Sequence, residues 1–315
     1  MFWYVCIFTK KIMKISVDLG ATFGKGFFGT KIFGLNLKEA LLKYDKNNQY
    51  FFYDFKTVFP KVFWMKLGVS FKEWHLKPDV FLALNQALPF YFHKKAIVFS
   101  HGLSFYFFPK CYPKNDLNRL ENQLKEMIKR ADKIVVSSKK VKDEFFQFFP
   151  KIKKKIYVLP FGIPFDCLKE KPKKTKEKFF LTLSGSQPIK NFSFIKEIFF
   201  EFKKKNPEYK LINVENFSRK KLINLYKKAT AFLTASYYES FNLPVLEALS
   251  LGCPVVGLES AVIPELRDYV NLARDKDNFL KLMKEIPKKP TPSLIKKLKK
   301  EFSWEKYVKK LVELY

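Results

Sequence analysis

The stretch YYESFNLPVLEALSLGCPVV, positions 237–256, decides how the rest of the chain is interpreted. It places two glutamates, Glu239 and Glu247, eight residues apart around a turn into an apolar helix. Glu247, one turn into the helix, would accept hydrogen bonds from a pair of vicinal hydroxyls, whereas Glu239 precedes the turn. The spacing alone carries little weight, because 30 acidic residues among 315 produce many such pairs. Two solvated glutamates around a helix start are therefore the alternative.

The start of that helix is expected to bind an anion. Asn242 stands where an N-cap is expected, and Leu243 and Pro244 follow in the first turn. The turn crosses the carboxyl end of a strand, so the amides of 241–245 would point into a cleft with the helix dipole behind them. A diphosphate fits such a site, and a carboxylate on either side fits the hydroxyls of a nucleotide sugar.

Length and composition indicate two ordinary domains. The chain has 315 residues, of which 47% are hydrophobic, so disorder is not expected. No apolar run reaches the roughly eighteen residues of a membrane-spanning helix. The opening MFWYVCIF makes a poor secretory signal, and we expect residues 1–12 to be an upstream extension or a small apolar membrane contact. The four cysteines lack metal-binding spacing, which suits a reducing cytoplasm and argues against a structural zinc site.

The net charge of +30 comes almost entirely from lysine, since only five of the 60 basic residues are arginine. A lysine-coated surface without a specific purpose is the simplest explanation. Polybasic faces are also drawn to phosphates and anionic lipid headgroups, so an anionic membrane surface stays open as a partner. Nucleic acid is not favoured, because base readout and phosphate forks favour arginine and no nucleic-acid-binding motif is present.

Strand-like and helix-like segments alternate along the chain. Apolar runs of strand length lie at 14–19, 50–55, 79–84, 96–100, 134–137 and 155–160, and again at 179–184, 210–214, 231–235 and 254–258. Helical spacing predicts helices at 31–44, 116–131, 138–149, 192–205, 219–229 and 243–251. Continuous apolar strands between helices predict an α/β protein with two doubly wound, Rossmann-like domains facing a cleft. Ligands are expected at the carboxyl ends of the strands.

A glycine loop follows the first strand and offers a different interpretation. Gly24, Gly26 and Gly29 form a literal GxGxxG, and Asp54 at the end of the next strand would be the ribose-binding acid of a dinucleotide site. The spacing is common by chance, and the glycines begin five residues after the strand rather than in a tight turn. A flexible glycine loop lining the cleft is the alternative.

The sequence ESFNLPVLEALSLGCPVVG strongly resembles the motif of retaining glycosyltransferases of family 4, glycosyl transferases group 1, which reads roughly E-x-F-G-L-P-x-x-E-A-x-x-x-G-x-P-V-V. Further pieces that resemble this family follow in order along nearly the whole chain. They are the glycine loop, IVFSHGLSF (97–105), RADKIVVSS (130–138), KIYVLPFGIPFD (155–166), SGSQPIKN (184–191) and FSWEKYVKKLVELY (302–315).

The resemblance implies the GT-B fold, with the C-terminal helix packing back on the N-terminal domain. We therefore expect an acceptor-side domain over 1–165, a linker over 166–178, a nucleotide-sugar-binding domain over 179–292 and returning helices over 293–315.

The resemblance also implies residue roles. Lys190 would neutralise the diphosphate, Glu239 would contact the donor sugar, and His101 would face that sugar across the cleft. Glu247 would hold the nucleotide ribose. The remaining donor-binding residues would be Ser240, Phe241, Asn242, Leu243 and Gly26. A lysine and a helix start supply positive charge where negative charge develops on the leaving group. No metal or other cofactor is therefore expected.

The chain departs from the family pattern at four positions. Gly185 stands where the family has a basic residue, and Ile189 fills a position that is often arginine. The diphosphate would thus lose a cation, which another lysine such as Lys25 would replace. Ser240 and Asn242 replace glycines and are expected to add side chains where the sugar sits.

These observations predict a retaining glycosyltransferase that moves a hexose from a nucleotide diphosphate sugar to a glycan or lipid-linked acceptor. The expected setting is cell-envelope polysaccharide synthesis in the cytoplasm, peripherally on the inner face of the plasma membrane. The aromatic, lysine-rich stretch 51–77 would rest on lipid, or else be ordinary core and surface. The alternatives are a dinucleotide-dependent oxidoreductase, a non-catalytic basic membrane-surface binding protein and a nucleotide-sugar epimerase.

Overall fold

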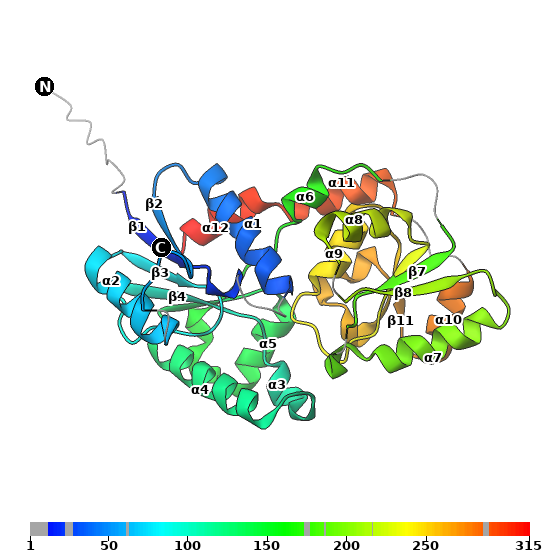
Figure 1. Ribbon diagram of the computed structural model, residues 1–315, viewed down its shortest axis with the longest axis horizontal. Helices are drawn as coiled ribbons and strands as arrows, with labels where there is room; N and C mark the ends of the chain where they lie inside the picture. Colours follow the sequence, from blue (N-terminus) through cyan, green and yellow to red (C-terminus); the bar gives the residue numbers. More distant parts are fainter. Residues whose placement is uncertain are drawn as a thin grey trace, which may run out of the picture.

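The computed structural model describes residues 12–22, 28–60, 63–172, 177–185, 187–215, 217–285 and 290–315. The predictions for Gly24, Lys25 and Gly26, and those for residues 1–11, lie outside these ranges. Figure 1 shows two α/β units side by side, with the first half of the chain on the left and the second on the right.

The N-terminal unit is built on a six-stranded parallel sheet with the order β2-β1-β3-β4-β5-β6. The strands are β1 Lys14–Asp18, β2 Gln49–Tyr53, β3 Val80–Ala83, β4 Lys95–Ser100, β5 Lys133–Val136 and β6 Ile156–Val158. The helices are α1 Phe28–Tyr44, the π-helical turn η2 Trp64–Val69, α2 Ser70–Leu76, α3 Ser104–Phe107, α4 Lys114–Arg130 and α5 Lys139–Phe148, with short 3₁₀ segments η1 Gly20–Thr22, η3 Pro109–Cys111 and η4 Pro150–Lys155.

The C-terminal unit has a five-stranded parallel sheet with the order β11-β10-β9-β7-β8. Its strands are β7 Phe179–Thr182, β8 Lys210–Asn213, β9 Ala231–Thr234, β10 Val255–Leu258 and β11 Asn271–Ala273. Its helices are α7 Phe192–Lys203, α8 Arg219–Lys228, α9 Leu243–Ser250, α10 Lys276–Lys284 and α11 Pro292–Glu301, with 3₁₀ segments η5 Pro188–Lys190, η6 Glu259–Ala261 and η7 Pro264–Tyr269. The short helix α6 Phe165–Leu168 lies in the connection between the units.

Both sheets confirm the doubly wound architecture expected from the sequence. The strands are apolar on both faces, and β3, β7 and β9 are buried over their whole length, which requires helices on both sides of the sheet. Strand order reverses between β1 and β3 in the first sheet and between β7 and β9 in the second. Such reversals open a crevice at the carboxyl ends of the strands, where ligands of doubly wound folds bind.

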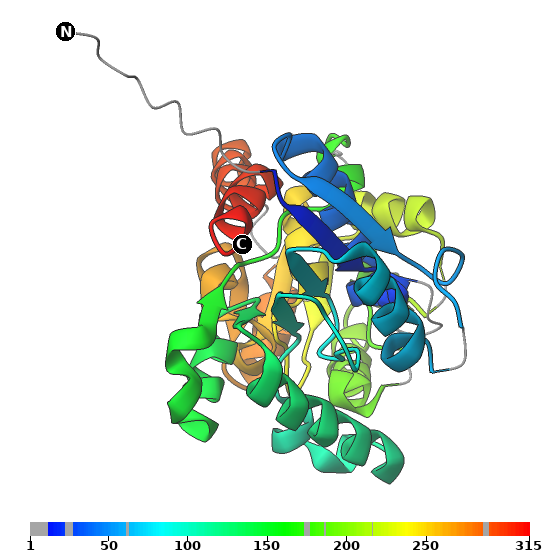
Figure 2. The ribbon, with the colours of Figure 1, turned by 90° about the vertical axis from the view of Figure 1, so that its left-hand side faces the viewer.

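The last helix, α12 Trp304–Val312, returns to the N-terminal unit and lies beside α1 (Figures 1 and 2). The indole N–H of Trp304 donates to the carbonyl oxygen of Ile163 over 2.9 Å, and the ring centroid lies 6.1 Å from that of Phe33 on α1. Helix α11 instead packs against α9 of the C-terminal unit. The chain therefore crosses between the units twice, before β7 and between α11 and α12.

Candidate functional site

The candidate site lies at the reversal point of the second sheet, where the loops after β7 and β9 meet. The amide of Tyr237 donates to the carbonyl oxygen of Ile189 over 2.9 Å. Asn191, in the left-handed conformation at φ 51°, donates its side-chain amide to the carbonyl oxygen of Ala235. These two bonds fasten the SGSQPIKN segment to the loop that begins the E-S-F-N-L-P motif, so segments about 50 residues apart share one edge of the sheet.

Two of the residues predicted from the sequence are in direct contact here. Lys190 Nζ lies 2.7 Å from Glu239 Oε1, and the same oxygen accepts a hydrogen bond from Ser236 Oγ over 2.7 Å. The lysine side chain is 26% exposed and the carboxylate 11% exposed. The pair is therefore shielded but reachable from solvent, and its cation and anion would be separated by a ligand that carries both phosphate and hydroxyl groups.

Glu247 has a different set of partners. Its carboxylate is 2% exposed and lies 2.7 Å from Arg219 NH1. Arg219, the first residue of α8, also makes two 2.9 Å bonds to the carboxylate of Asp166 in α6. The structure thus brings Glu239 and Lys190 together but directs Glu247 toward α8 and the connection between the units.

Burial and the arginine act on the pKa of Glu247 in opposite directions. Burial dominates and raises this pKa to about 6, while Arg219 limits the rise. The pKa of Asp166 is also pushed up by burial, but Arg219 outweighs that effect and lowers it. The hydroxyl of Tyr226, fully buried on the same helix as Arg219, also acts on Glu247 and lowers the pKa of that carboxyl. Arg219 was not predicted from the sequence, because a lysine-rich helix start gives no sign of an inward-pointing arginine.

The start of α9 differs in one respect from the sequence prediction. The helix begins at Leu243 as expected, but the Asn242 side chain does not cap it. Asn242 is left-handed at φ 62°, and its Nδ2 donates to Thr234 Oγ1 and to the carbonyl oxygen of Ala261. The position therefore needs the conformation that glycine adopts freely and asparagine tolerates best among other residues. The expectation that Asn242 adds a side chain where the sugar sits is wrong, because that side chain points into its own domain.

The amides of the turn are only partly available for an anion. Val245 donates its amide to the carbonyl oxygen of Asn242, and Pro244 has no amide hydrogen. The amides of 241–243 have no hydrogen-bond partner within the described residues and are the ones left for a ligand. The side chains of Phe241 and Leu243 are buried, and the ring centroids of Phe241 and Phe161 lie 4.8 Å apart. These two residues would therefore act through their backbone.

His101 directly follows β4, where the N-terminal sheet meets this loop. Its Nε2 bonds the carbonyl oxygen of Leu84 over 2.8 Å, and burial lowers its pKa, so a neutral imidazole donating from Nε2 fits the site. The next residue, Gly102, lies against the motif loop: a Cβ added there would be 3.1 Å from the Cβ of Ser240. The structure therefore places the His101 segment and the Glu239 segment next to each other across the two units.

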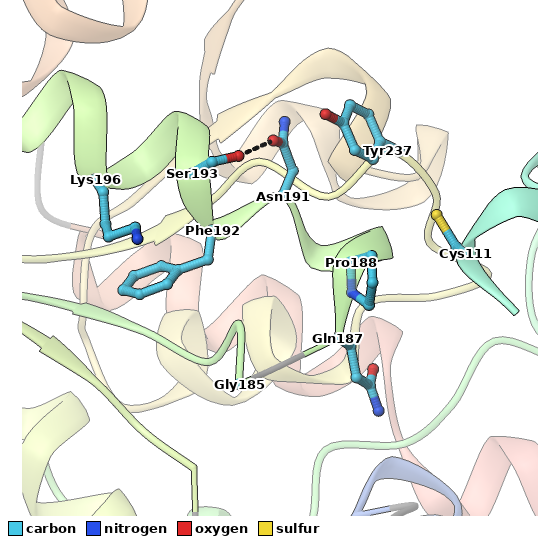
Figure 3. Close-up of a pocket in the computed structure, with 9 residues that line it drawn as sticks. All are labelled: Cys111, Gly185, Gln187, Pro188, Asn191, Phe192, Ser193, Lys196 and Tyr237. Carbon is cyan, nitrogen blue, oxygen red and sulfur yellow. Dashed lines mark hydrogen bonds between the residues drawn. The ribbon is translucent and has the colours of Figure 1, made fainter.

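A cavity of about 440 Å³ opens beside these residues (Figure 3). It is lined by Cys111 from the N-terminal unit and by Gly185, Gln187, Pro188, Asn191, Phe192, Ser193, Lys196 and Tyr237 from the C-terminal unit. The lining includes Asn191, which follows Lys190 in the chain, and Tyr237, two residues before Glu239, but neither Lys190 nor Glu239 itself. Figure 3 shows Cys111 and Tyr237 on one side and the start of α7 with Lys196 on the other. The motif SGSQPIKN (184–191) contains several of these lining residues, but nothing in the sequence pattern indicated Cys111 or Lys196.

The remaining sequence predictions concern metals, cysteines and the glycine loop. No cluster of His, Cys, Asp or Glu suited to a metal ion is found in the described part of the chain. No two of the described cysteines, Cys111, Cys167 and Cys253, form a disulfide bond with each other. Asp54, suggested as a ribose acid, accepts hydrogen bonds from the amides of Lys56 and Thr57 in the turn after β2. Its carboxylate therefore stabilises its own turn.

Comparison with known proteins places these observations in a family context. Residues 170–272 match the sequence model described as Glycosyl transferases group 1. A probable sucrose-phosphate synthase of Thermosipho melanesiensis is 26% identical over 236 residues, which cover 60% of this chain and 55% of that protein. An O-antigen chain mannosyltransferase B of Escherichia coli is 41% identical over 54 residues, covering 17% of this chain and 14% of that protein. The chain thus matches about half of the length of the first of these relatives, and less of the second.

A solved structure extends the likeness to nearly the whole chain. Anabaena HepE in complex with UDP and glucose superimposes with a TM-score of 0.68 at 12% sequence identity, covering 96% of this chain and 99% of that one. At this identity the likeness concerns the fold alone. It confirms the GT-B fold implied by the motifs, with two Rossmann-like units and a returning C-terminal helix.

Proposed function

Because residues 170–272 match the model of Glycosyl transferases group 1 and the chain has the GT-B fold, we propose that it is a retaining glycosyltransferase. Its reaction moves a hexose from a nucleotide diphosphate sugar to a glycan or lipid-linked acceptor in cell-envelope polysaccharide synthesis. The observation that carries the proposal is the Lys190–Glu239 pair at the reversal point of the second sheet. The E. coli relative, named as an O-antigen chain mannosyltransferase, supports the polysaccharide setting.

Lys190 and Glu239 divide the donor between them in this proposal. The diphosphate takes Lys190 away from Glu239, since a doubly charged phosphate group attracts the ammonium more strongly than one carboxylate does. Glu239, still held by Ser236, then accepts hydrogen bonds from the hexose hydroxyls. As the glycosidic bond breaks, negative charge grows on the leaving diphosphate, and Lys190 with the amides of 241–243 stabilises it. No metal is required for these roles.

The second cation of the diphosphate site is expected to be a lysine. Gly185, where the family has a basic residue, adopts φ +52° with open space around it, a conformation that disfavours any side chain. Lys196 lines the cavity on the first turns of α7, close in sequence to Lys190. We assign the missing positive charge to Lys196, alongside the sequence-based suggestion of Lys25.

Glu247 binds the nucleotide ribose only if its contact with Arg219 loosens. In the structure the guanidinium occupies one of the two oxygens that ribose hydroxyls would use. The buried Tyr226 hydroxyl, which lowers the pKa of Glu247, offers one compensating donor in the same region. Ser240 contributes near the sugar, and His101, neutral and fixed to Leu84, faces the donor from the N-terminal unit. Gly26 completes the proposed donor-binding set.

Attack on the same face from which the diphosphate leaves accounts for retention in this proposal. The acceptor hydroxyl adds to the anomeric carbon as an ion pair forms, and its proton passes to the departing phosphate oxygen. A covalent enzyme intermediate is not invoked, because Glu239, the carboxylate at the cleft, is held by Ser236 and assigned to the hexose hydroxyls.

The donor is tested by titration calorimetry with UDP-, GDP- and ADP-hexoses. At least one should bind, and nuclear magnetic resonance should show that the transferred or hydrolysed hexose keeps its anomeric configuration. Stabilisation by a nicotinamide dinucleotide, without any response to nucleotide sugars, would instead support the oxidoreductase alternative. Interconversion of donor sugars without an acceptor would support an epimerase.

We further propose that the acceptor is met at an anionic membrane surface through an outward-facing aromatic stripe. Phe63, directly before η2, is followed at spacings of three and four residues by Leu67, Phe71 and Trp74 on η2 and α2, and 45–73% of each is exposed. Such spacing puts side chains on one side of a helix. None of the helices within the described ranges is long and apolar enough to span a bilayer.

The charges around this stripe favour an anionic partner. Glu73, the sole acid of residues 63–77, is fully buried and accepts a hydrogen bond from Ser16 Oγ over 2.6 Å. Lys72 on the same helix is half-buried, and Lys77, which directly follows the helix, is exposed. The helix thus turns its acid inward and its aromatics outward, as an interfacial element does. Figure 1 places α2 at the edge of the N-terminal unit away from the other unit.

Co-sedimentation with phospholipid vesicles tests this surface. The wild type should sediment with phosphatidylglycerol-containing vesicles and little with pure phosphatidylcholine. The double change Phe71→Ser and Trp74→Ser should weaken binding about tenfold or more, because two exposed aromatic rings no longer enter the interface. Phe200→Ser, which removes a 65% exposed phenylalanine from α7, is the control and should bind normally. Equal sedimentation of all variants would contradict the proposal.

A further inference from the structure

The segment that carries Glu239 is held by hydrogen bonds to the N-terminal unit. The side chain of Tyr238 leaves its own domain and is 6% exposed among residues of the N-terminal unit. Its hydroxyl donates to Glu144 Oε2 over 2.6 Å and accepts the amide of Leu103 over 3.0 Å. Glu144, on α5, is itself only 7% exposed. A buried carboxylate of one domain thus finds a hydrogen-bond donor in the other.

The N-terminal unit is shaped to admit this tyrosine. Gly102 adopts φ +94°, and a Cβ added there would lie 2.3 Å from the Tyr238 hydroxyl oxygen. The ring of Phe107 stacks on that of Tyr238 at 6.0 Å between ring centroids. Lys140 on α5 places its Nζ 4.1 Å from the centroid of the tyrosine ring. The glycine is therefore needed for two reasons, its left-handed backbone and the absence of a side chain.

The backbone on either side of the Glu239 side chain is held as well. Ser137 Oγ and Ser138 Oγ both donate to the carbonyl oxygen of Ser240, over 3.1 and 2.7 Å. Lys140 Nζ donates to the carbonyl oxygen of Glu239 itself over 3.1 Å. Residues 238, 239 and 240 are consequently each bonded to the N-terminal unit, while the Glu239 carboxylate remains turned toward Lys190 of its own unit.

We propose that Tyr238 and Glu144 form an interdomain clamp that positions Glu239 for the reaction, and that both are positioning residues. Burying a carboxylate and a phenol is costly unless they are paired, and the C-terminal fold gains nothing from a tyrosine that leaves it. Under the proposed function the C-terminal unit holds the donor and the N-terminal unit the acceptor, so their relative placement must be fixed to a fraction of an ångström. The clamp rests on the proposed function for its effect on rate, but not for its existence.

The test compares donor binding with turnover in Tyr238→Phe and Glu144→Gln. Both variants should bind the nucleotide sugar with a Kd within about twofold of the wild type, while kcat falls about tenfold or more. Glu144→Gln keeps an acceptor for the tyrosine hydroxyl and should lose less than Tyr238→Phe. The control is Tyr269→Phe, which removes a 2.6 Å bond to Glu301 inside the C-terminal unit and should leave kcat unchanged. An unchanged kcat in Tyr238→Phe, or a Kd that weakens in parallel with kcat, would overturn the proposal.

Amide hydrogen exchange separates failure of the clamp from failure of the proposed function. The Leu103 amide donates to the Tyr238 hydroxyl, so Tyr238→Phe should speed its exchange and Tyr269→Phe should not. Unchanged exchange at Leu103 would refute the clamp whatever the activity. Faster exchange in a protein that binds no nucleotide sugar would uphold the clamp and reject the glycosyltransferase proposal.

Discussion

At the scale of single residues, the buried carboxylates differ in the kind of partner that they contact. Glu247 has an arginine, Glu144 a tyrosine and Glu239 a lysine with a serine. Glu73 is neighboured by uncharged groups, the hydroxyls of Ser16 and Tyr53. Burial is accordingly the largest influence on Glu73 and raises its pKa to about 7, while Ser16 and Tyr53 act in the opposite direction.

This predicts a stability that depends on pH through Glu73. The unfolded chain ionises this carboxyl near 4.5 and the folded protein near 7, so the folded state holds the proton more tightly and loses stability as pH rises between these values. Glu73→Gln keeps an acceptor for Ser16 and does not ionise. Its free energy of unfolding, relative to wild type, should therefore rise by about 1–3 kcal/mol between pH 4.5 and 7.5. Urea unfolding at several pH values measures this, and a difference that stays flat would show that Glu73 ionises normally.

Elements were largely predictable because burial on both sides of a parallel sheet gives an unambiguous apolar pattern. The strands at 14–18, 80–83, 179–182 and 231–234, and the start of α9 at Leu243, agree with the sequence prediction within one or two residues. The pair η2 and α2 was not predicted as helical. Phe63, Leu67, Phe71 and Trp74 are exposed in this region, whereas Trp64, Val69 and the acid Glu73 are buried. Large apolar residues on both the buried and the exposed side leave no clear helical periodicity in the sequence.

The left-handed start of α9 allows a test at this scale. Asn242→Ala loses both side-chain hydrogen bonds and forces alanine into φ 62°, whereas Asn242→Gly loses only the bonds. The alanine variant should therefore have a lower free energy of unfolding than the glycine variant by about 1 kcal/mol. The order should reverse at Asn224, an exposed position within α8, where glycine is the poorer helix former. A glycine variant at 242 that is the less stable of the two would contradict the assigned backbone conformation.

At the scale of the whole molecule, the sequence predicted two domains and the GT-B fold but not how the domains grip each other. The motif placed Lys190 and Glu239 at one sheet edge, because the carboxyl ends of neighbouring parallel strands meet there. Nothing in the pattern paired Tyr238 with Glu144 or Arg219 with Glu247, since these contacts join segments 94 and 28 residues apart and depend on the packed arrangement. The predicted convergence of both glutamates on one ligand likewise requires Arg219 to move.

The whole account depends on the Lys190–Glu239 pair being a diphosphate and sugar site. Titration calorimetry with UDP, GDP and ADP, on wild type, Lys190→Ala and Lys276→Ala, tests this most directly. Lys276 forms a comparable ion pair with Glu197 on the exposed side of the C-terminal unit and serves as the control. We predict that one nucleoside diphosphate binds to wild type and to Lys276→Ala alike, and that Lys190→Ala weakens its binding about tenfold or more, the loss of a charged hydrogen bond. Binding of equal strength to Lys190→Ala, or to none of the three proteins, would contradict the central claim.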